Sequence, residues 1–351
     1  MNFLRTLFFA TVMLFASRAA NAEVELRFDL TAAEAVMALF EHEEPTRADV
    51  EALLELPGVK ATISQTSRFD SDATEEAYIE SLLAILSGET PENDPFRFAG
   101  VRDRLDAIRV GLADLKANQG DFAADISQMM GSYTSAATNV ETMLYAVLGG
   151  TSDAWAPGNG NFYMALQYFR DDAIGLAAMT AHEVYHVVQK SFFHVFKDER
   201  PTIPARMLAE NLFLEGTATL VGDPMNFEGD GSYLEFLQDK HTRNLRRINE
   251  NFALFEALYF RAANDPEVPF GPIYNLGFSG GWDSPLYFVG FHITQGLEKH
   301  LGRERLVEIL GTMTGPEILA EYIRVYRETG DMEMVTFSPT IEALIQAQIA
   351  P

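Results

Sequence analysis

The stretch AIGLAAMTAHEVYHVVQ spans residues 173–189, and Glu183 carries its only charged side chain. Asp171 and Asp172 precede this stretch and are typical of a helix N-terminus, where negative charge meets the helix dipole. A helix that is apolar on every side should be buried. Its middle nevertheless holds two histidines and a carboxylate, which are costly to bury without partners. The stretch therefore predicts a central buried helix whose polar groups are compensated by a further group.

His182 and His186 are the candidate metal ligands on this helix. Histidines four residues apart lie on one helix face, so both imidazoles can bind a single ion. Glu183 projects about 100° around the helix from His182, beside the ion rather than toward it. That position suits a base acting on metal-activated water. The alternative is a core helix with two accidentally satisfied histidines, because a motif of five residues can arise by chance.

Glu215 is the candidate third ligand, since catalytic zinc usually takes three protein ligands and keeps one position for water. Residues 211–222 form a second apolar helical run, in which Glu215 is the only charged residue. Gly216 beside it would let this second helix closely approach the helix at residues 173–189, which we call the zinc helix. The alternative for Glu215 is an ion pair at a helix end with a residue such as Arg206.

The HExxH motif at residues 182–186 is followed by a second helix that contains Glu-Gly-Thr-Ala at residues 215–218. This arrangement resembles the glutamate zincins. It is most similar to uncharacterised exported zinc peptidases that carry HExxH followed by EGxA. The resemblance covers residues 173–224, and the C-terminal helices more loosely. It implies a zincin-like metallopeptidase fold with a small sheet beside the HExxH helix. It also implies that His182, His186 and Glu215 bind Zn²⁺ and that Glu183 is the catalytic base.

Departures from related patterns narrow this class. Gln189 and Phe192 stand where metzincins carry a glycine and a third histidine, which excludes metzincins. Thermolysin-like members place an aspartate four residues after the glutamate ligand to orient a histidine, whereas this chain has Thr219. Another group must then orient the histidine, and Thr219, Asn211 or a backbone carbonyl are candidates. The glycine, methionine, glutamate and asparagine signature of the aminopeptidases is also missing.

Tyr287 is the candidate for stabilising the oxyanion that develops during hydrolysis. Ser284 and Pro285 are typical of an N-cap followed by a first-turn proline, which places Tyr287 near the start of a helix. Tyr274 and His292 are rival candidates. A core aromatic role is the alternative for each of them.

The remaining pattern predicts a mostly helical α+β fold. Predicted strands cover 24–30, 140–148 and 162–169. Predicted helices cover 74–86 and 101–117. Two further helices are expected to start with capping boxes at Thr31 and Thr46. Loops are expected at 88–95, 149–161 and 275–285. The strand at 162–169 immediately precedes the zinc helix. It is either an edge strand that pairs with an extended substrate or an ordinary internal strand.

Residues 1–22 have the features of an export signal, with a basic Arg5, an apolar stretch and the small residues Ala20-Asn21-Ala22 before the cleavage site. We therefore expect a signal peptide at 1–22, a helical N-terminal region at 23–131 and a zincin-like catalytic domain at 132–351. The 351-residue chain has no cysteine, which excludes disulfides and thiol ligands. An exported protein without disulfides fits a bacterial periplasm or the medium.

The strongly negative net charge of the mature chain limits the partners that we expect it to bind. Loss of the signal takes away two arginines and no acidic residue, so 24 basic residues face 51 acidic ones and the net charge changes from −25 to −27. Such a field repels nucleic acid and anionic lipid. We expect an exported zinc-dependent peptidase that hydrolyses peptide or protein substrates through a zinc-activated water. The alternatives are a zinc hydrolase of another amide and a zinc-binding module without catalysis. The oligomeric state is not predicted.

Overall fold

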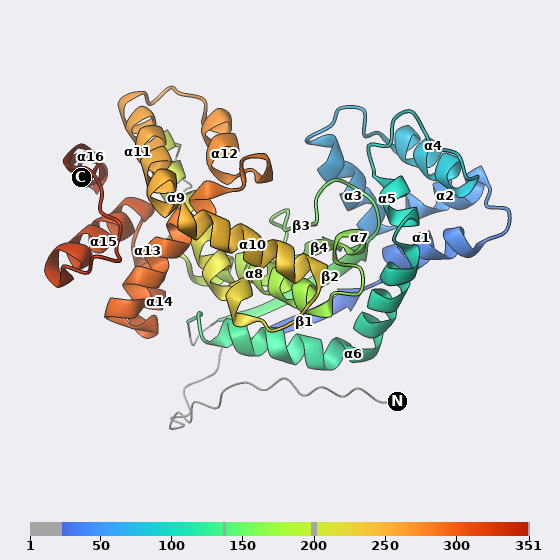
Figure 1. The fold of residues 1–351 in the computed structure, drawn as a ribbon, viewed down its shortest axis with the longest axis horizontal. Coiled ribbons are helices and arrows are strands. Elements are labelled where there is room, and N and C mark those ends of the chain that lie inside the picture. The colour runs from blue at the N-terminus through green and yellow to red at the C-terminus, as the bar shows by residue number, and fades with distance from the viewer. Residues whose placement is uncertain (1–22, 136–137, 198–201, 350–351) are drawn as a thin grey trace.

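The computed structural model describes residues 23–135, 138–197 and 202–349, which form many helices and one small sheet (Figure 1). The predicted class, α+β and mostly helical, is confirmed. The predicted signal peptide, residues 1–22, lies outside the described residues. Within the described ranges, no helix combines the length and the apolar character that crossing a membrane requires.

The sheet has four strands in the order β1-β2-β4-β3. Their bounds are Glu23–Asp29 for β1, Asn139–Val147 for β2, Ala154–Trp155 for β3 and Phe162–Ala165 for β4. β1, β2 and β4 run parallel, while β3 pairs antiparallel with β4 and forms one edge of the sheet. The strands predicted at 24–30 and 140–148 are confirmed.

The strand predicted at 162–169 is only half right. β4 ends at Ala165, and a one-turn helix, α7 (Leu166–Phe169), follows it. β4 is also internal, because β2 and β3 flank it. The edge next to β4 is the two-residue β3, which lies inside the segment predicted as a loop. Strand pairing over many residues decides which strand is the edge, and local composition does not report it.

The first five N-terminal helices lie on one side of the molecule, and the long α6 runs from there beneath the sheet (Figure 1). They are α1 (Thr31–Glu41), α2 (Arg47–Leu53), α3 (Pro57–Ser67), α4 (Glu75–Leu86), α5 (Phe98–Arg102) and α6 (Leu105–Gly131). The capping box of Thr46 with Asp49 is confirmed, and so is the helix at 74–86. The capping box at Thr31 is wrong, because Leu30 is the N-cap and the Thr31 N–H donates to Asp29 Oδ1 at 2.9 Å. The helix predicted at 101–117 is divided between α5 and the longer α6.

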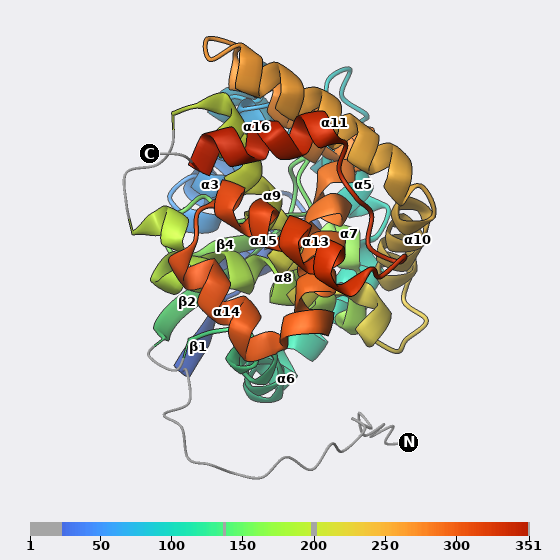
Figure 2. The ribbon, with the colours of Figure 1, turned by 90° about the vertical axis from the view of Figure 1, so that its left-hand side faces the viewer.

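The later helices extend from the centre of the fold to the opposite side, where α13 to α16 gather, as Figure 2 shows from that end. The long helices are α8 (Ala173–Phe192), α9 (Pro204–Val221), α10 (Ser232–Arg246), α11 (Ile248–Asn264), α13 (Pro285–Leu301) and α15 (Gly315–Thr329). Shorter ones are α12 (Phe270–Phe278), α14 (Arg303–Thr312) and α16 (Pro339–Ile349), with single 3₁₀ turns η1 (His194–Phe196), η2 (Pro224–Asn226) and η3 (Gly280–Trp282). The loop predicted at 275–285 is therefore partly helical.

α8 occupies the middle of the fold and joins the two sides. It packs against β2 and α6 on one side and against α9 and α10 on the other. Buried apolar residues from Val24 to Ile345 form one continuous cluster. α6 ends at Gly131, and the sheet combines β1 from before that point with three strands from after it. The division into regions 23–131 and 132–351 stays a prediction.

Candidate metal centre

The middle of α8 presents two histidines to the same side. The helix starts as expected, because the Asp172 side chain accepts a hydrogen bond from the Gly175 N–H at 2.8 Å. His182 and His186 follow one turn apart, with their Nε2 atoms 3.1 Å from each other. Their rings are nearly perpendicular, with centroids 4.8 Å apart. Two nitrogen donors therefore converge on one point beside α8.

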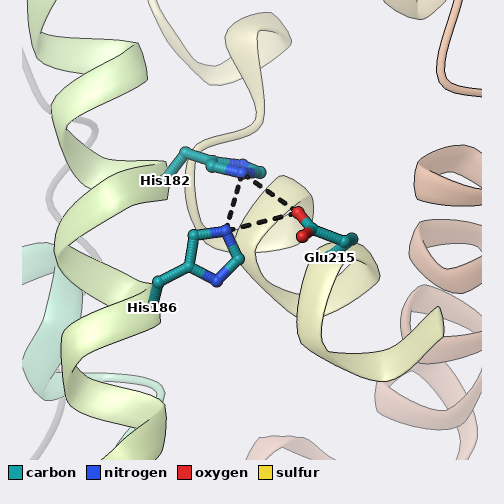
Figure 3. A group of neighbouring side chains, drawn as sticks. All are labelled: His182, His186 and Glu215. Atoms are coloured by element: carbon teal, nitrogen blue, oxygen red, sulfur yellow. Dashed lines mark hydrogen bonds and ion pairs between the residues drawn. The ribbon is translucent and has the colours of Figure 1, made fainter. Parts of the chain in front are cut away.

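Glu215 on α9 meets these nitrogens from the neighbouring helix (Figure 3). Its Oε2 atom lies 3.6 Å from His182 Nε2 and 3.3 Å from His186 Nε2. Donor atoms about 2.1 Å from a tetrahedral ion lie about 3.4 Å from one another, so the spacing matches a zinc site. Among the described residues, these three are the one group of His, Asp and Glu side chains whose arrangement could hold a metal ion.

The Glu215 Oε2 atom itself indicates that an ion belongs there. It is buried, and it has no hydrogen-bond partner within the protein. Burial raises the pKa of the Glu215 carboxyl, but the neighbouring imidazoles outweigh that effect and hold the pKa well below its usual range. A charged, buried oxygen without a donor is costly, and a cation between it and the two imidazoles would offset the cost.

Gln189 orients His186, and the sequence reasoning did not select it for this role. Its side-chain NH₂ donates to Leu214 O at 2.7 Å and to Thr217 Oγ1 at 2.9 Å, both on α9. Its Oε1 is therefore directed at His186 Nδ1, 3.1 Å away, and accepts the proton of that nitrogen. In the neutral imidazole that a metal binds, the Nε2 atom of His186 then carries the lone pair, and this atom faces Glu215.

The groups predicted for this orienting role do something else. Thr219 donates its hydroxyl to Glu215 O at 2.8 Å, and Asn211 donates its amide to Met207 O at 2.7 Å. Both bonds stay inside α9. Gln189 lies three residues after His186 on the same helix, fully buried and uncharged. That spacing is the local signal that could have identified it.

Close approach between α8 and α9 depends on Gly222 rather than on Gly216. A Cβ atom at Gly222 would lie 2.9 Å from His182 N and 2.9 Å from Ala178 O, so only glycine lets the end of α9 lie against α8 here. Gly216 instead faces α13, where a Cβ would lie 2.4 Å from the Cα of Gly290. The prediction that Gly216 serves the contact with the zinc helix is wrong, because helix rotation turns it toward a different neighbour.

Glu183 lies beside this group, 7% exposed. Burial raises the pKa of its carboxyl, His186 opposes that rise, and the Glu215 and Asp153 charges add to it, so that the pKa lies at about 7. A carboxyl with a pKa near the working pH is suited to taking and returning a proton. The alternative ion pair for Glu215 is not present, because Arg206 donates to Gln348 O at 2.7 Å.

The comparisons with known proteins agree with this geometry. Residues 50–330 match the family described as "putative zinc dependent peptidase (DUF5700)". The chain belongs to that family. No curated protein and no solved structure gives a significant match.

The three candidates for the oxyanion role lie at different places relative to the metal centre of this protein. The Tyr287 ring is parallel to the His182 ring, with centroids 5.8 Å apart and an angle of 5°. Burial and then the Glu215 charge raise the pKa of Tyr287 well above its usual value, so its phenol stays protonated. Tyr274 is connected to Tyr287 through the Phe278 ring, and burial and then the Glu215 charge raise the pKa of its phenol. His292 is not at the centre, since its Nε2 accepts a hydrogen bond from Val335 N at 3.4 Å.

An aromatic row leads from the metal centre along α12 to the surface. Tyr287 contacts Phe278 with centroids 6.1 Å apart, and Phe278 stacks on Tyr274 at 5.2 Å. Leu276 and Trp282, beside this row in the chain, are 38% and 63% exposed. Tyr274 at the end of this row is itself 36% exposed, so the row reaches solvent.

Proposed function

We propose that the protein is an exported zinc-dependent peptidase with its catalytic centre between α8 and α9. The observation that supports this most is the buried Glu215 Oε2 atom, which lies 3.6 Å and 3.3 Å from two imidazole nitrogens at the spacing that a shared ion requires. Two nitrogens and one carboxylate oxygen are the donor set of many catalytic zinc sites, which keep a fourth position open. His182, His186 and Glu215 would hold the ion.

Bound zinc would supply Lewis acidity, lowering the pKa of a water molecule and polarising the carbonyl of the substrate. Glu183 takes a proton from the attacking water, whose oxygen forms a bond to the carbonyl carbon. Glu183 then returns that proton to the nitrogen of the leaving amine as the carbon–nitrogen bond breaks. A buried carboxyl whose pKa is raised to about 7 can perform both transfers near neutral pH.

Tyr287 donates a hydrogen bond from its phenol to the carbonyl oxygen as negative charge develops on that atom. Its place beside His182 and the raised pKa of its hydroxyl support this role. The sheet edge at β3 offers backbone groups to an extended peptide. The aromatic row along α12 favours substrates with a large apolar side chain near the bond that is cleaved.

Glu183→Gln tests the function directly. We expect about one zinc per chain in both proteins. We expect hydrolysis of casein or of a peptide library to fall about 10²–10⁴-fold in the variant, because the proton acceptor is lost while the ligands remain. Zinc is measured by elemental analysis, and cleavage products by mass spectrometry.

Three results would contradict the proposal. A folded wild type without zinc argues against the metal centre. A zinc-loaded wild type that cleaves nothing in the library argues against peptidase activity and favours another amide substrate or a binding module. Equal cleavage by the wild type and Glu183→Gln removes Glu183 from the mechanism. Export is tested separately, since the N-terminus of the protein from a bacterial periplasmic fraction should lie near Glu23.

A further inference from the structure

The turn that precedes Tyr287 has an unusual backbone. Asp283 (φ 67°, ψ 18°) and Ser284 (φ 49°, ψ 54°) are both left-handed, and neither is glycine. Within the described ranges they are the only two adjacent non-glycine residues with positive φ. Ser284 also precedes Pro285, a position that favours extended backbone. Such conformations persist only where the surrounding structure holds them, and they concentrate at functional sites.

Three side chains of α10 and that of Arg247, the residue directly after it, hold this turn. Arg243 donates to both carboxylate oxygens of Asp283, from Nε to Oδ2 and from Nη2 to Oδ1, each at 3.0 Å. Arg247 Nη2 donates to Asp283 Oδ2 at 2.6 Å. Asn244 Nδ2 donates to Asp283 O at 3.2 Å, and Lys240 Nζ donates to the Ser284 hydroxyl at 3.2 Å. We call these four residues, Lys240, Arg243, Asn244 and Arg247, the α10 clamp.

The opposite end of α10 from the clamp is connected to α8, the helix with the two histidines. The Asp172 carboxylate accepts from Gly175 N at the start of α8. The same carboxylate accepts from Tyr233 N at 2.9 Å and from Leu234 N at 2.8 Å, at the start of α10. One buried side chain therefore fixes the start of α10 relative to α8, the helix that carries the candidate metal ligands.

The turn is joined directly to Tyr287. The Tyr287 N–H donates to Ser284 O at 3.1 Å, so the left-handed turn forms the first hydrogen bond of α13. Lys240 Nζ also lies 5.7 Å from the centroid of the Tyr287 ring, within the range of a cation–π contact. A change in the turn would therefore move the ring that stacks on His182.

We propose that the α10 clamp, acting on Asp283 and Ser284, is a positioning device that sets Tyr287 against His182 and Glu215. Arg243, Arg247 and Asp283 are positioning residues, since they act through Tyr287 and not on the substrate. The inference rests on the proposed function for its kinetic consequence. Its structural part, an ordered turn that depends on Asp283, does not require catalysis.

Asp283→Ala tests the clamp, and Asp331→Ala is the matched control. Asp331 holds the opposite end of α13, accepting from Lys299 Nζ at 2.8 Å and from His300 Nε2 at 2.8 Å. Its side chain is 14% exposed, against 24% for Asp283. Both variants remove an aspartate that two basic residues bind, Arg243 and Arg247 for Asp283 and Lys299 and His300 for Asp331. Only Asp283 is connected to Tyr287.

We expect Asp283→Ala to lower kcat by up to about 10²-fold with little change in KM or zinc content, since a displacement of about 1 Å has such effects. Asp331→Ala should leave kcat unchanged. Asp283→Asn should keep most of the activity, because asparagine tolerates left-handed backbone and retains an acceptor for Arg243. In a Tyr287→Phe background, Asp283→Ala should add less than about threefold, because both changes then affect one interaction.

Hydrogen exchange of the zinc-loaded protein supplies a readout that needs no substrate. Backbone amides of residues 283–288 should exchange faster in Asp283→Ala than in the wild type and in Asp331→Ala. Unchanged exchange there overturns the clamp whether or not the protein cleaves peptides. Additive effects with Tyr287→Phe, or an equal loss of kcat in Asp331→Ala, overturn the link to Tyr287. A wild type with an ordered turn and no peptidase activity overturns the proposed function while the clamp stands.

Discussion

The start of α8 and the contact between α8 and α9 each bury a carboxylate, and the surroundings satisfy the two in different ways. Asp172 is 7% exposed and accepts three backbone N–H groups, those of Gly175, Tyr233 and Leu234. Glu215 Oε2 has no hydrogen-bond donor, and two imidazole nitrogens face it instead. Three backbone donors satisfy the Asp172 carboxylate without any added group. The Glu215 carboxylate needs a cation to offset its buried charge.

The comparison separates a carboxylate that stabilises the fold from one that we propose as a metal ligand. Burial alone does not distinguish them, because both are removed from solvent. The group that satisfies each carboxylate does distinguish them. Backbone N–H groups are part of the folded chain, whereas a metal ion must be bound from solution. Three substitutions test the distinction, in order of their expected effect on zinc binding.

Glu215→Gln should have the largest effect. It removes the negative charge from the ligand set, so zinc affinity should fall by more than the roughly 100-fold seen when outer partners are lost. Competition with a chelator measures the affinity. Glu210→Gln is the control on the same helix, because Glu210 is also buried and accepts a hydrogen bond from Gly315 N at 2.7 Å. Zinc affinity that falls equally in both variants would contradict the assignment of Glu215.

Gln189→Leu should have an intermediate effect. It removes the acceptor for His186 Nδ1, so the ring loses its fixed tautomer and zinc affinity should fall about 10–100-fold. Gln167→Leu is the matched control. Gln167 is equally buried and accepts from Gly149 N at 3.2 Å, away from the histidines. If both leucine variants bind zinc like the wild type, Gln189 does not orient the ligand.

Asp172→Ala should have the smallest effect on zinc and a clear one on stability. Loss of an acceptor shared by three buried N–H groups should lower the free energy of unfolding by about 1–3 kcal/mol, with zinc affinity unchanged. Urea unfolding of the metal-free protein measures the stability. Asp171→Ala, at the exposed neighbouring position, should stay within about 0.5 kcal/mol of the wild type. Zinc loss in Asp172→Ala without lower stability would remove the distinction between the two carboxylates.

Much of the candidate centre followed from local patterns. The spacing of His182 and His186 decides that both side chains leave α8 on one face, because the helix has a period of 3.6 residues. The single charge in each of two apolar runs marks Glu183 and Glu215, since an apolar helix has no other reason to carry one. Ser284 and Pro285, as an N-cap followed by a first-turn proline, predicted Tyr287 at a helix start, and α13 begins at Pro285.

Other features depend on contacts between distant segments. Gln189 orients His186 only because Leu214 and Thr217 on α9 accept its amide protons. β4 is internal because the two-residue β3 folds back beside it. A two-residue strand has no periodicity of its own to report.

The sequence by itself determined that this chain forms a buried helix with two histidines and a base, and that a second helix carries one matching carboxylate. Helical periodicity and the cost of burying charge act within about a dozen residues, so they can be read along the chain. The tertiary structure decided which glycine lets α9 approach α8, which strand forms the edge, and how α10 holds the turn before Tyr287. These depend on how whole helices rotate and pack against one another, and no local pattern encodes that rotation.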